Sequence, residues 1–246
     1  MIVNIPYLNV YNDKGKLTTQ LIYGEKVEVL GDETNFGTKV KSLWDGYTGF
    51  IDTKDLIPDY NQDIKINVLS APVFQGADLK SPHICNLSLN SQCQSIEISG
   101  DFINIGIGWV YNKHTCPVNE VYSFDKIIDL AELFLNVPYV WGGKSSNWID
   151  CSAFIQMIFM ACGIDIPRDT SEQCKLNWDK VDISNISKAD LVFWDGHIGI
   201  MTDDKNIIHA NATDMMVKKD SLINVENNIK TKENKDISLI LRYKND

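Results

Sequence analysis

The chain has 246 residues, of which 44% are hydrophobic, so it is long enough to bury one large core or two to three smaller ones. A formal net charge of -10 argues against sequence-independent binding to nucleic acid, which depends on clustered Lys and Arg. No stretch approaches 18 consecutive apolar residues, and the first twenty residues lack the basic start and apolar core of a signal peptide. We therefore expect no membrane span and no membrane partner, and a cytoplasmic protein.

The six cysteines follow no regular spacing and contain no C-x-x-C pair. They are Cys85, Cys93, Cys116, Cys151, Cys162 and Cys174. This pattern favours free thiols in a reducing compartment over the alternative of three disulfides. It also lacks the spacing of zinc ligands, so the sequence predicts no metal and no other cofactor.

Short alternating runs in the first half of the chain indicate β-structure. Residues 26–30 (KVEVL), 38–43 (TKVKSL) and 47–52 (YTGFID) alternate in polarity and are separated by Gly, Asp and Asn. Closely spaced strands and turns of this kind are typical of a small all-β barrel.

The pattern of the first barrel recurs further along the chain. Residues 20–30 followed by 45–51 are loosely repeated by residues 83–96 followed by 106–111. Two similar barrels in tandem explain this repeat, and one larger β domain is the alternative.

The character of the sequence changes after about residue 120, and we predict domains at 1–60, 61–120 and 121–246. Residues 124–136 place apolar side chains along one broad face, which predicts a helix. Pro138 blocks its continuation and begins a glycine-broken loop.

A second helix is predicted over DCSAFIQMIFMACG, residues 150–163, because this run is almost entirely apolar. Asp150 suits its N-cap and Gly163 its C-terminal cap. Four later runs, ADLVFW, HIGIMT, NIIHAN and SLILRY, are rich in β-branched and aromatic residues and predict an antiparallel sheet. Helices followed by strands indicate an α+β domain.

Cys151 is the candidate nucleophile because it falls in the first turn of the predicted buried helix. The unpaired backbone N–H groups and the positive end of the helix dipole favour a thiolate there. The alternative is a small buried apolar residue, which is our interpretation of Cys162 and Cys174.

A nucleophilic cysteine needs a base, and two of the four histidines lie on candidate strands. If the hairpin between them is centred on Asp203, His197 and His209 stand opposite each other on one face. One imidazole would then take the thiol proton while the other orients it through its remaining ring nitrogen. A slip of one residue would separate them, and two unrelated strand histidines are the alternative. The two remaining histidines, His83 and His114, are expected to play no catalytic part.

Four ordered motifs carry a resemblance that covers about 120 residues. The motifs are PYVWGGKSSNWIDCSAF, IPRDTSEQ, ADLVFWDGHIGIM and IIHA. They resemble the NlpC-type family of bacterial cell-wall cysteine endopeptidases. The resemblance implies a papain-like α+β peptidase domain with Cys151 as nucleophile, His197 as base and His209 as the orienting third member.

The resemblance also implies a set of substrate-pocket residues around the nucleophile. They are Tyr139, Asp150, Ser152, Arg168, Asp169 and Thr170. The Tyr139 hydroxyl would help to bind substrate or the oxyanion. The alternatives are that Asp150 only caps the helix and that Arg168 only braces a loop.

Residues 19–30 (TQLIYGEKVEVL) followed by 45–51 (DGYTGFI) are similar to the bacterial SH3-like domain of one branch of these peptidases. That branch implies a γ-D-glutamyl-L-diamino acid endopeptidase acting on murein peptides with a free N-terminal L-Ala, in cytoplasmic cell-wall recycling. The first barrel would close the N-terminal end of the groove, where Tyr47 and an acidic residue hold the amine.

One position departs from that branch. Lys16 stands where an acidic residue is usual, so Glu25 or Asp45 would have to bind the amine instead. A secreted or wall-anchored hydrolase of the same chemistry and a catalytically silent wall-binding protein are the two alternatives.

Overall fold

The structure is a computed structural model that describes residues 1–244. It divides into two compact units, each described by itself below. The N-terminal unit comprises Met1–Val121 together with the short segment Trp141–Ser146, and the C-terminal unit comprises Tyr122–Val140 and the chain from Asn147 onward. None of the helices in the described chain is long and apolar enough to span a membrane.

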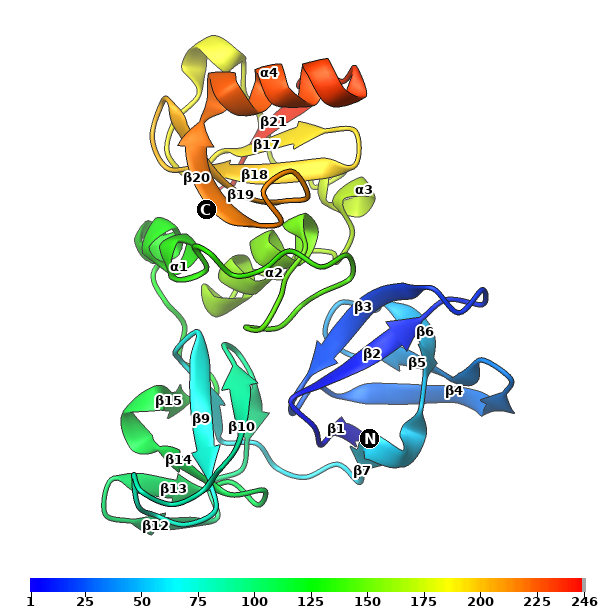
Figure 1. Cartoon of the computed structure of the whole chain (residues 1–246), viewed down its shortest axis with the longest axis vertical. Helices are drawn as coiled ribbons and strands as arrows, with labels where there is room; N and C mark the ends of the chain where they lie inside the picture. The colour runs from blue at the N-terminus through cyan, green and yellow to red at the C-terminus, as the bar shows by residue number, and fades with distance from the viewer. Residues whose placement is uncertain (245–246) are drawn as a thin grey trace. The chain divides into compact units, whose positions relative to one another are not determined.

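Five antiparallel strands form the first sheet of the N-terminal unit, in the order β3-β2-β6-β5-β4 (Figure 1). They are β2 (Tyr7–Tyr11), β3 (Leu17–Ile22), β4 (Val27–Thr34), β5 (Gly37–Ser42) and β6 (Thr48–Ile51). Strand β1 (Ile2–Val3) pairs with β7 (Leu56–Ile57), which follows the 3-10 helix η1 (Thr53–Asp55). The three runs predicted for this barrel are confirmed as β4, β5 and β6, around a core that includes Leu8, Val10, Leu21, Val40 and Ile51.

A second sheet repeats this arrangement, in the order β10-β9-β14-β13-β12. Its strands are β9 (Ser70–Phe74), β10 (His83–Ser88), β12 (Glu97–Ser99), β13 (Phe102–Asn104) and β14 (Trp109–Tyr111). Beside it, β8 (Ile64–Ile66) pairs with both β11 (Gln92–Cys93) and β15 (Thr115–Pro117), and η2 (Asn112–His114) occupies the place of η1.

Taken in chain order, the first sheet's five strands and their counterparts in the second follow the same path, so the predicted repeat is present in the topology. The second sheet has its own apolar cluster, which includes Ile66, Val73, Leu87 and Val110. Both sheets belong to one compact unit, and the division at residues 60 and 120 stays a prediction.

The C-terminal unit contains a six-stranded antiparallel sheet in the order β16-β21-β17-β18-β19-β20. Its strands are β16 (Asp179–Lys180), β17 (Leu191–Trp194), β18 (His197–Met201), β19 (Asn206–Asn211), β20 (Met216–Ser221) and β21 (Leu239–Arg242). The four predicted runs are confirmed as β17, β18, β19 and β21. The papain-like α+β class expected for this part of the chain is therefore observed.

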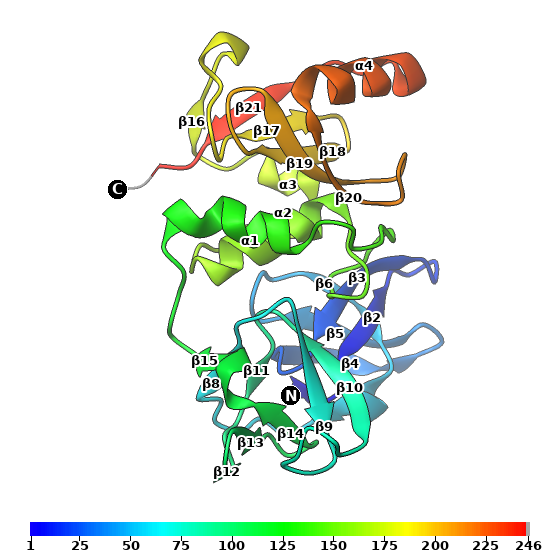
Figure 2. The ribbon, with the colours of Figure 1, turned by 60° about the vertical axis from the view of Figure 1, so that its left-hand side comes forward.

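Helices cover both faces of this sheet (Figures 1 and 2). On one side lie α1 (Ile127–Leu133), preceded by η3 (Phe124–Lys126), and α2 (Cys151–Ala161), while α4 (Leu222–Glu233) lies on the other. The short elements α3 (Thr170–Gln173) and η4 (Ile183–Asn185) lie in the connection between α2 and β17.

The first predicted helix is shorter than expected. It ends at Leu133, and Asn136 has a positive φ of 68°, a left-handed conformation that does not continue an α-helix. Helix α4 was not predicted, because only Leu222 and Val225 of its twelve residues are buried.

The second predicted helix is confirmed with both of its caps. Every residue of α2 is buried, and the Asp150 side chain accepts a hydrogen bond from the Ala153 N–H at 2.9 Å. Gly163 follows with a φ of 74°, and its N–H donates to the Met160 carbonyl at 2.9 Å. The helix is therefore held at both ends and along its whole length, which fixes the position of its first residue.

Candidate active site

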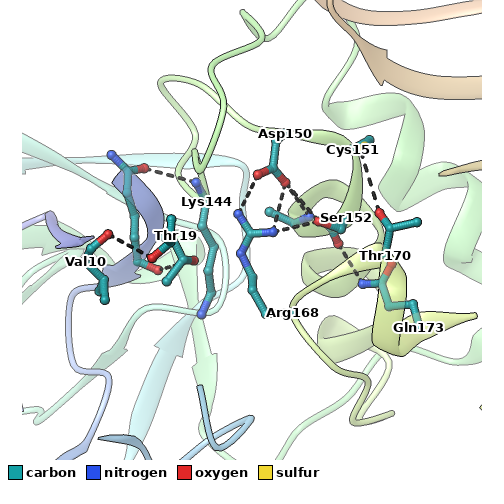
Figure 3. A network of polar contacts seen from close by, with 12 residues as sticks. Val10, Thr19, Lys144, Asp150, Cys151, Ser152, Arg168, Thr170 and Gln173 are labelled. Carbon is teal, nitrogen blue, oxygen red and sulfur yellow. Dashed lines mark hydrogen bonds and ion pairs between the residues drawn. The ribbon is translucent and has the colours of Figure 1, made fainter. Parts of the chain in front are cut away.

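The Cys151 side chain lies at the start of this fixed helix and is 7% exposed. Its sulfur lies 3.9 Å from the Thr170 hydroxyl, a contact that is drawn as a dashed line in Figure 3. The backbone N–H of Ile198 also hydrogen-bonds to this thiol. Because Ile198 follows His197 directly, the beginning of β18 lies beside the nucleophile.

The pKa of the Cys151 thiol is raised to about 12, chiefly by burial and secondly by the nearby Asp150 carboxylate. Hydrogen bonds from Thr170 and Ile198 and the charge of Arg168 act in the opposite direction but are smaller. The expectation that the helix terminus alone favours a resting thiolate is therefore wrong, because desolvation outweighs it. The thiol is neutral at rest and must transfer its proton during the reaction.

The two predicted catalytic histidines contact each other. Nε2 of His197 lies 2.8 Å from Nδ1 of His209, and the two rings meet edge to face with centroids 5.1 Å apart. The pKa of His197 is lowered to about 3, chiefly by burial and secondly by His209, and the pKa of His209 is lowered to about 4, chiefly by burial. Both rings are therefore neutral near pH 7, the state in which an imidazole can accept a proton.

The strand register that brings the histidines together differs from the expected one by two residues. The hairpin pairs Ile200 with Ile208 and Met201 with Ile207, so continuing this register sets Gly199, not His197, opposite His209. A shift of two residues keeps every side chain on its original face, which explains why the rings still meet.

Arg168 forms a buried network with the residues on either side of the nucleophile (Figure 3). Its guanidinium donates to both Asp150 oxygens, at 3.0 and 2.6 Å, and to the Ser152 hydroxyl at 2.7 Å. Gln173 donates to the Ser152 carbonyl at 3.0 Å and so ties α3 to the same turn. These contacts brace the start of α2, and direct contact of Asp150, Ser152 or Arg168 with substrate stays a prediction.

The remaining predicted pocket residues of this unit lie close to the thiol or on the neighbouring short helix. Burial raises the pKa of the half-buried Tyr139 hydroxyl, and Cys151 raises it further. Tyr139 forms a bridge with Ile149, which keeps it beside the chain that enters α2. Asp169 is the N-cap residue of α3, whose first residue, Thr170, contacts the nucleophile.

Comparisons with known proteins agree with this geometry. Residues 136–233 match the NlpC/P60 family, and residues 12–56 match the bacterial dipeptidyl-peptidase Sh3 domain. The chain is similar to a probable endopeptidase NlpC homologue of Haemophilus influenzae, with 40% identity over 151 residues that cover 58% of this chain and 82% of the relative.

The chain belongs to the NlpC/P60 family. This is a family of cysteine peptidases, so the protein is an enzyme of that class. It is also similar to the γ-D-glutamyl-L-lysine dipeptidyl-peptidase of Bacillus subtilis strain 168, with 27% identity over 220 residues that cover 80% of this chain and 73% of the relative. A crystal structure of an NlpC/P60 family protein from Bacillus cereus ATCC 10987 has the same fold, with a TM-score of 0.78, 24% identity, and coverage of 94% of this chain and 83% of the other.

In this NlpC/P60 chain, the Glu25 carboxylate already forms a buried ion pair with Lys144. Its two carboxylate oxygens each lie 3.1 Å from Nζ of Lys144, and its side chain is 1% exposed. The Glu25 carboxylate is therefore paired with Lys144, and its contact with the substrate amine stays a prediction. Asp45, which accepts a hydrogen bond from the Tyr47 N–H at 2.9 Å, is the other candidate from the sequence, and Asp45 and Tyr47 are both half-buried.

Two residues that the sequence analysis did not single out also contact the histidine pair. Asn211 Nδ2 lies 3.3 Å from Nε2 of His209. Asn211 follows His209 by two residues on the same strand, and this spacing puts both side chains on one face, so the sequence could have indicated the contact. A Cβ atom on Gly199 would lie 3.1 Å from Cβ of His209 and 2.7 Å from a side-chain carbon of Ile207. The absence of a Cβ atom at Gly199 therefore leaves room for the His209 side chain.

The other two histidines lie on elements of the N-terminal unit. His83 is exposed on β10, and His114 is the last residue of η2. All six cysteines have free thiols. Among residues 1–244, no three His, Cys, Asp or Glu side chains gather as they would around a metal ion.

Proposed function

We propose that this enzyme hydrolyses the bond between γ-D-Glu and the L-diamino acid, either diaminopimelate or Lys, in murein peptides with a free N-terminal L-Ala. The observation that carries the chemistry is a buried thiol at the start of α2, beside the beginning of β18, where His197 contacts His209 of β19. The name of the Bacillus subtilis relative supports the choice of bond. The match of residues 12–56 to the Sh3 domain of bacterial dipeptidyl-peptidases supports it as well.

In the proposed mechanism, His197 accepts the Cys151 proton as the sulfur attacks the γ-carbonyl carbon of D-Glu. The resulting oxyanion is held by backbone N–H groups at the start of α2 and by the Tyr139 hydroxyl. His197 then protonates the departing amine of the diamino acid, which leaves a thioester on Cys151. Water hydrolyses the thioester, releases L-Ala-D-Glu and restores the thiol, while His209 keeps the His197 ring oriented.

We propose substrate-binding residues in each unit, taken by itself. In the C-terminal unit, Tyr139, Asp169 and Thr170 are proposed to contact the peptide, and Arg168 acts through its hold on Asp150 and Ser152. In the N-terminal unit, Tyr47 and Asp45 are proposed to bind the free amine. A carboxylate suits a cationic terminus, since burying an unpaired ammonium group is costly.

The proposed role is the recycling of wall peptides in the cytoplasm. Free thiols at all six cysteines are compatible with a reducing compartment. The competing role is that of a secreted or wall-anchored hydrolase, which would prefer whole sacculi to soluble peptide and would fractionate outside the cytoplasm. A silent wall-binding protein would bind sacculi and cleave neither substrate.

Digestion of L-Ala-γ-D-Glu-L-Lys and its diaminopimelate counterpart, each beside an N-acetylated copy, tests the proposal. We expect release of L-Ala-D-Glu from the free-amine peptides and little from the acetylated copies, which would leave the acidic site unpaired. Tyr47→Ala should raise KM and weaken the discrimination between free and acetylated peptides. Tyr47→Phe removes only the hydroxyl, so it measures how much of this effect the hydroxyl contributes. Comparable cleavage of free and acetylated peptides by the unmodified enzyme would refute amine recognition.

A further inference from the structure

The orientation of the Asn211 side-chain amide is fixed by backbone groups. Its Oδ1 lies 2.7 Å from the backbone nitrogen of Asp214, an N–H group that can only donate. Its Nδ2 lies 3.4 Å from the backbone carbonyl oxygen of Met216, which can only accept. Turning the amide over would set two donors against each other at 2.7 Å, so Nδ2 is the atom that faces His209.

This orientation determines which nitrogen of His209 carries the proton. Asn211 Nδ2 is 3.3 Å from Nε2 of His209 and can only donate, so Nε2 must present its lone pair. The neutral ring then carries its proton on Nδ1. That atom lies 2.8 Å from Nε2 of His197, so His209 donates to His197 at rest.

The direction of this bond matters for the base. When Nε2 of His197 accepts from His209, the neutral His197 ring carries its own proton on Nδ1, and its single lone pair is already engaged. His197 can take up a thiol proton on Nδ1 only after the pair changes tautomer.

The change of tautomer conserves the number of protons. One proton moves from Nδ1 of His209 to Nε2 of His197, one leaves Nδ1 of His197 for solvent, and one is taken from solvent at Nε2 of His209. The new N–H of His209 would then face the amide donor of Asn211, which disfavours the changed state.

We propose that Asn211 is a positioning residue that holds His209 in the Nδ1–H tautomer and thereby limits when His197 can act as a base. This inference rests on the proposed function for its consequence in catalysis, but its structural part does not. An aspartate at the same position would accept from Nε2 of His209 and reverse the direction of the bond between the rings.

Other charged groups near the histidine pair also shift the pKa values of the two rings, so they contribute to any measured pH dependence. Asp214 and Asp220 raise the pKa of His209 while Lys218 lowers it, and Lys235 lowers the pKa of His197. Asn211→Asp adds a charge as well as an acceptor. The double variant Asn211→Asp/Asp214→Asn keeps the formal charge of the natural chain and so separates the two effects.

Nitrogen-15 NMR of the histidine rings tests the tautomer directly and needs no substrate. The chain has four histidines, so single substitutions assign every ring. We expect His209 in the natural protein at neutral pH to be protonated on Nδ1 and not on Nε2. Asn211→Asp and the double variant should show the reverse, and Asn211→Leu, which lacks the donor, should lose the preference.

The pH profile of kcat/KM on the free-amine peptide is the second measurement. Asn211→Asp should move its acid limb to higher pH by about one unit, because an acceptor next to His209 favours protonated imidazoles. The double variant should keep most of this shift.

Protonation of His209 on Nε2 in the natural protein would overturn the proposal, and so would an unchanged tautomer in a folded Asn211→Asp. If Asn211→Asp does not fold, Asn211→Leu decides the question in the same spectrum. Absence of peptide cleavage together with the expected spectra would refute the proposed function and leave the tautomer assignment standing.

Discussion

Lys144 and Glu25 form an ion pair in which both side chains are 1% exposed. The Ser42 hydroxyl and the Ile22 N–H complete the hydrogen bonds of the carboxylate, at 2.9 and 3.1 Å. The ammonium group of Lys144 also lies 5.1 Å from the centroid of the Trp44 ring. The pair thereby fastens the segment Trp141–Ser146 into the N-terminal unit, a few residues before Cys151 in the chain.

Removing one partner of this pair should destabilise the protein strongly. Glu25→Gln or Lys144→Met leaves a buried group without its counter-charge, which costs about 3–5 kcal/mol. The double variant should lose less than the sum of the two single losses. Urea unfolding measures these changes, with Lys26→Met as control because the Lys26–Asp59 pair is exposed and should cost less than about 1 kcal/mol. Equal small losses in all variants would mean that the buried pair contributes little.

Stability should fall as the pH is lowered from about 6.5 toward about 3. The pKa values of His197 and His209 are lowered to about 3 and about 4 in the folded protein, whereas an unfolded histidine titrates near 6.5. In this window the unfolded state binds more protons, so acid favours unfolding. The midpoint of thermal unfolding between pH 7 and pH 4 is the measurement.

His209→Asn should reduce the loss of stability in acid, whereas His83→Gln, at an exposed position on β10, serves as the control. A slope that is the same in the natural chain and in His209→Asn would contradict the assignment of this effect to the buried pair.

The two histidines should differ in their contribution to the rate. His197→Ala removes the base and should be nearly as damaging as loss of the nucleophile. His209→Asn removes an orienting group and should leave measurable turnover. Steady-state kcat and KM on the free-amine peptide distinguish the variants, and equal residual rates would show that the roles are not divided in this way.

Thiol alkylation should inactivate the enzyme, while chelation should not. The mechanism needs a reactive sulfur at Cys151 and no metal. Iodoacetamide and EDTA are applied in parallel, and Cys174→Ser, which removes a partly exposed thiol other than the buried Cys151, should remain as sensitive as the natural chain. Activity lost on chelation and restored by zinc would contradict the peptidase class.

Sequence patterns predicted the elements that depend on local rules. The apolar run from Cys151, with Asp150 before it and Gly163 after it, carries the signals of a capped buried helix. Helix α4 lacked such a signal because its burial depends on two residues packed against a distant sheet. The repeat in the first half was visible in the sequence, whereas the pairing order of its strands required the structure.

The candidate site shows the same division between local signals and tertiary contacts. Spacing placed His197 and His209 on one face, although the register was wrong by two residues. The resting state of Cys151 could not be read from its place on a helix, because desolvation depends on packing from other elements. Burial of Lys144 was also hidden, since a lysine in a glycine-rich loop is typical of an exposed position.

The most direct test of the central claim is the rate at which L-Ala-D-Glu is released from L-Ala-γ-D-Glu-L-diamino acid by the natural chain and by Cys151→Ala. The structure predicts that the natural chain releases the dipeptide, whereas a folded Cys151→Ala retains less than about 1% of that rate because it lacks the nucleophile. Release by Cys151→Ala at a rate comparable to that of the natural chain would contradict the assignment of Cys151 and the mechanism built on it.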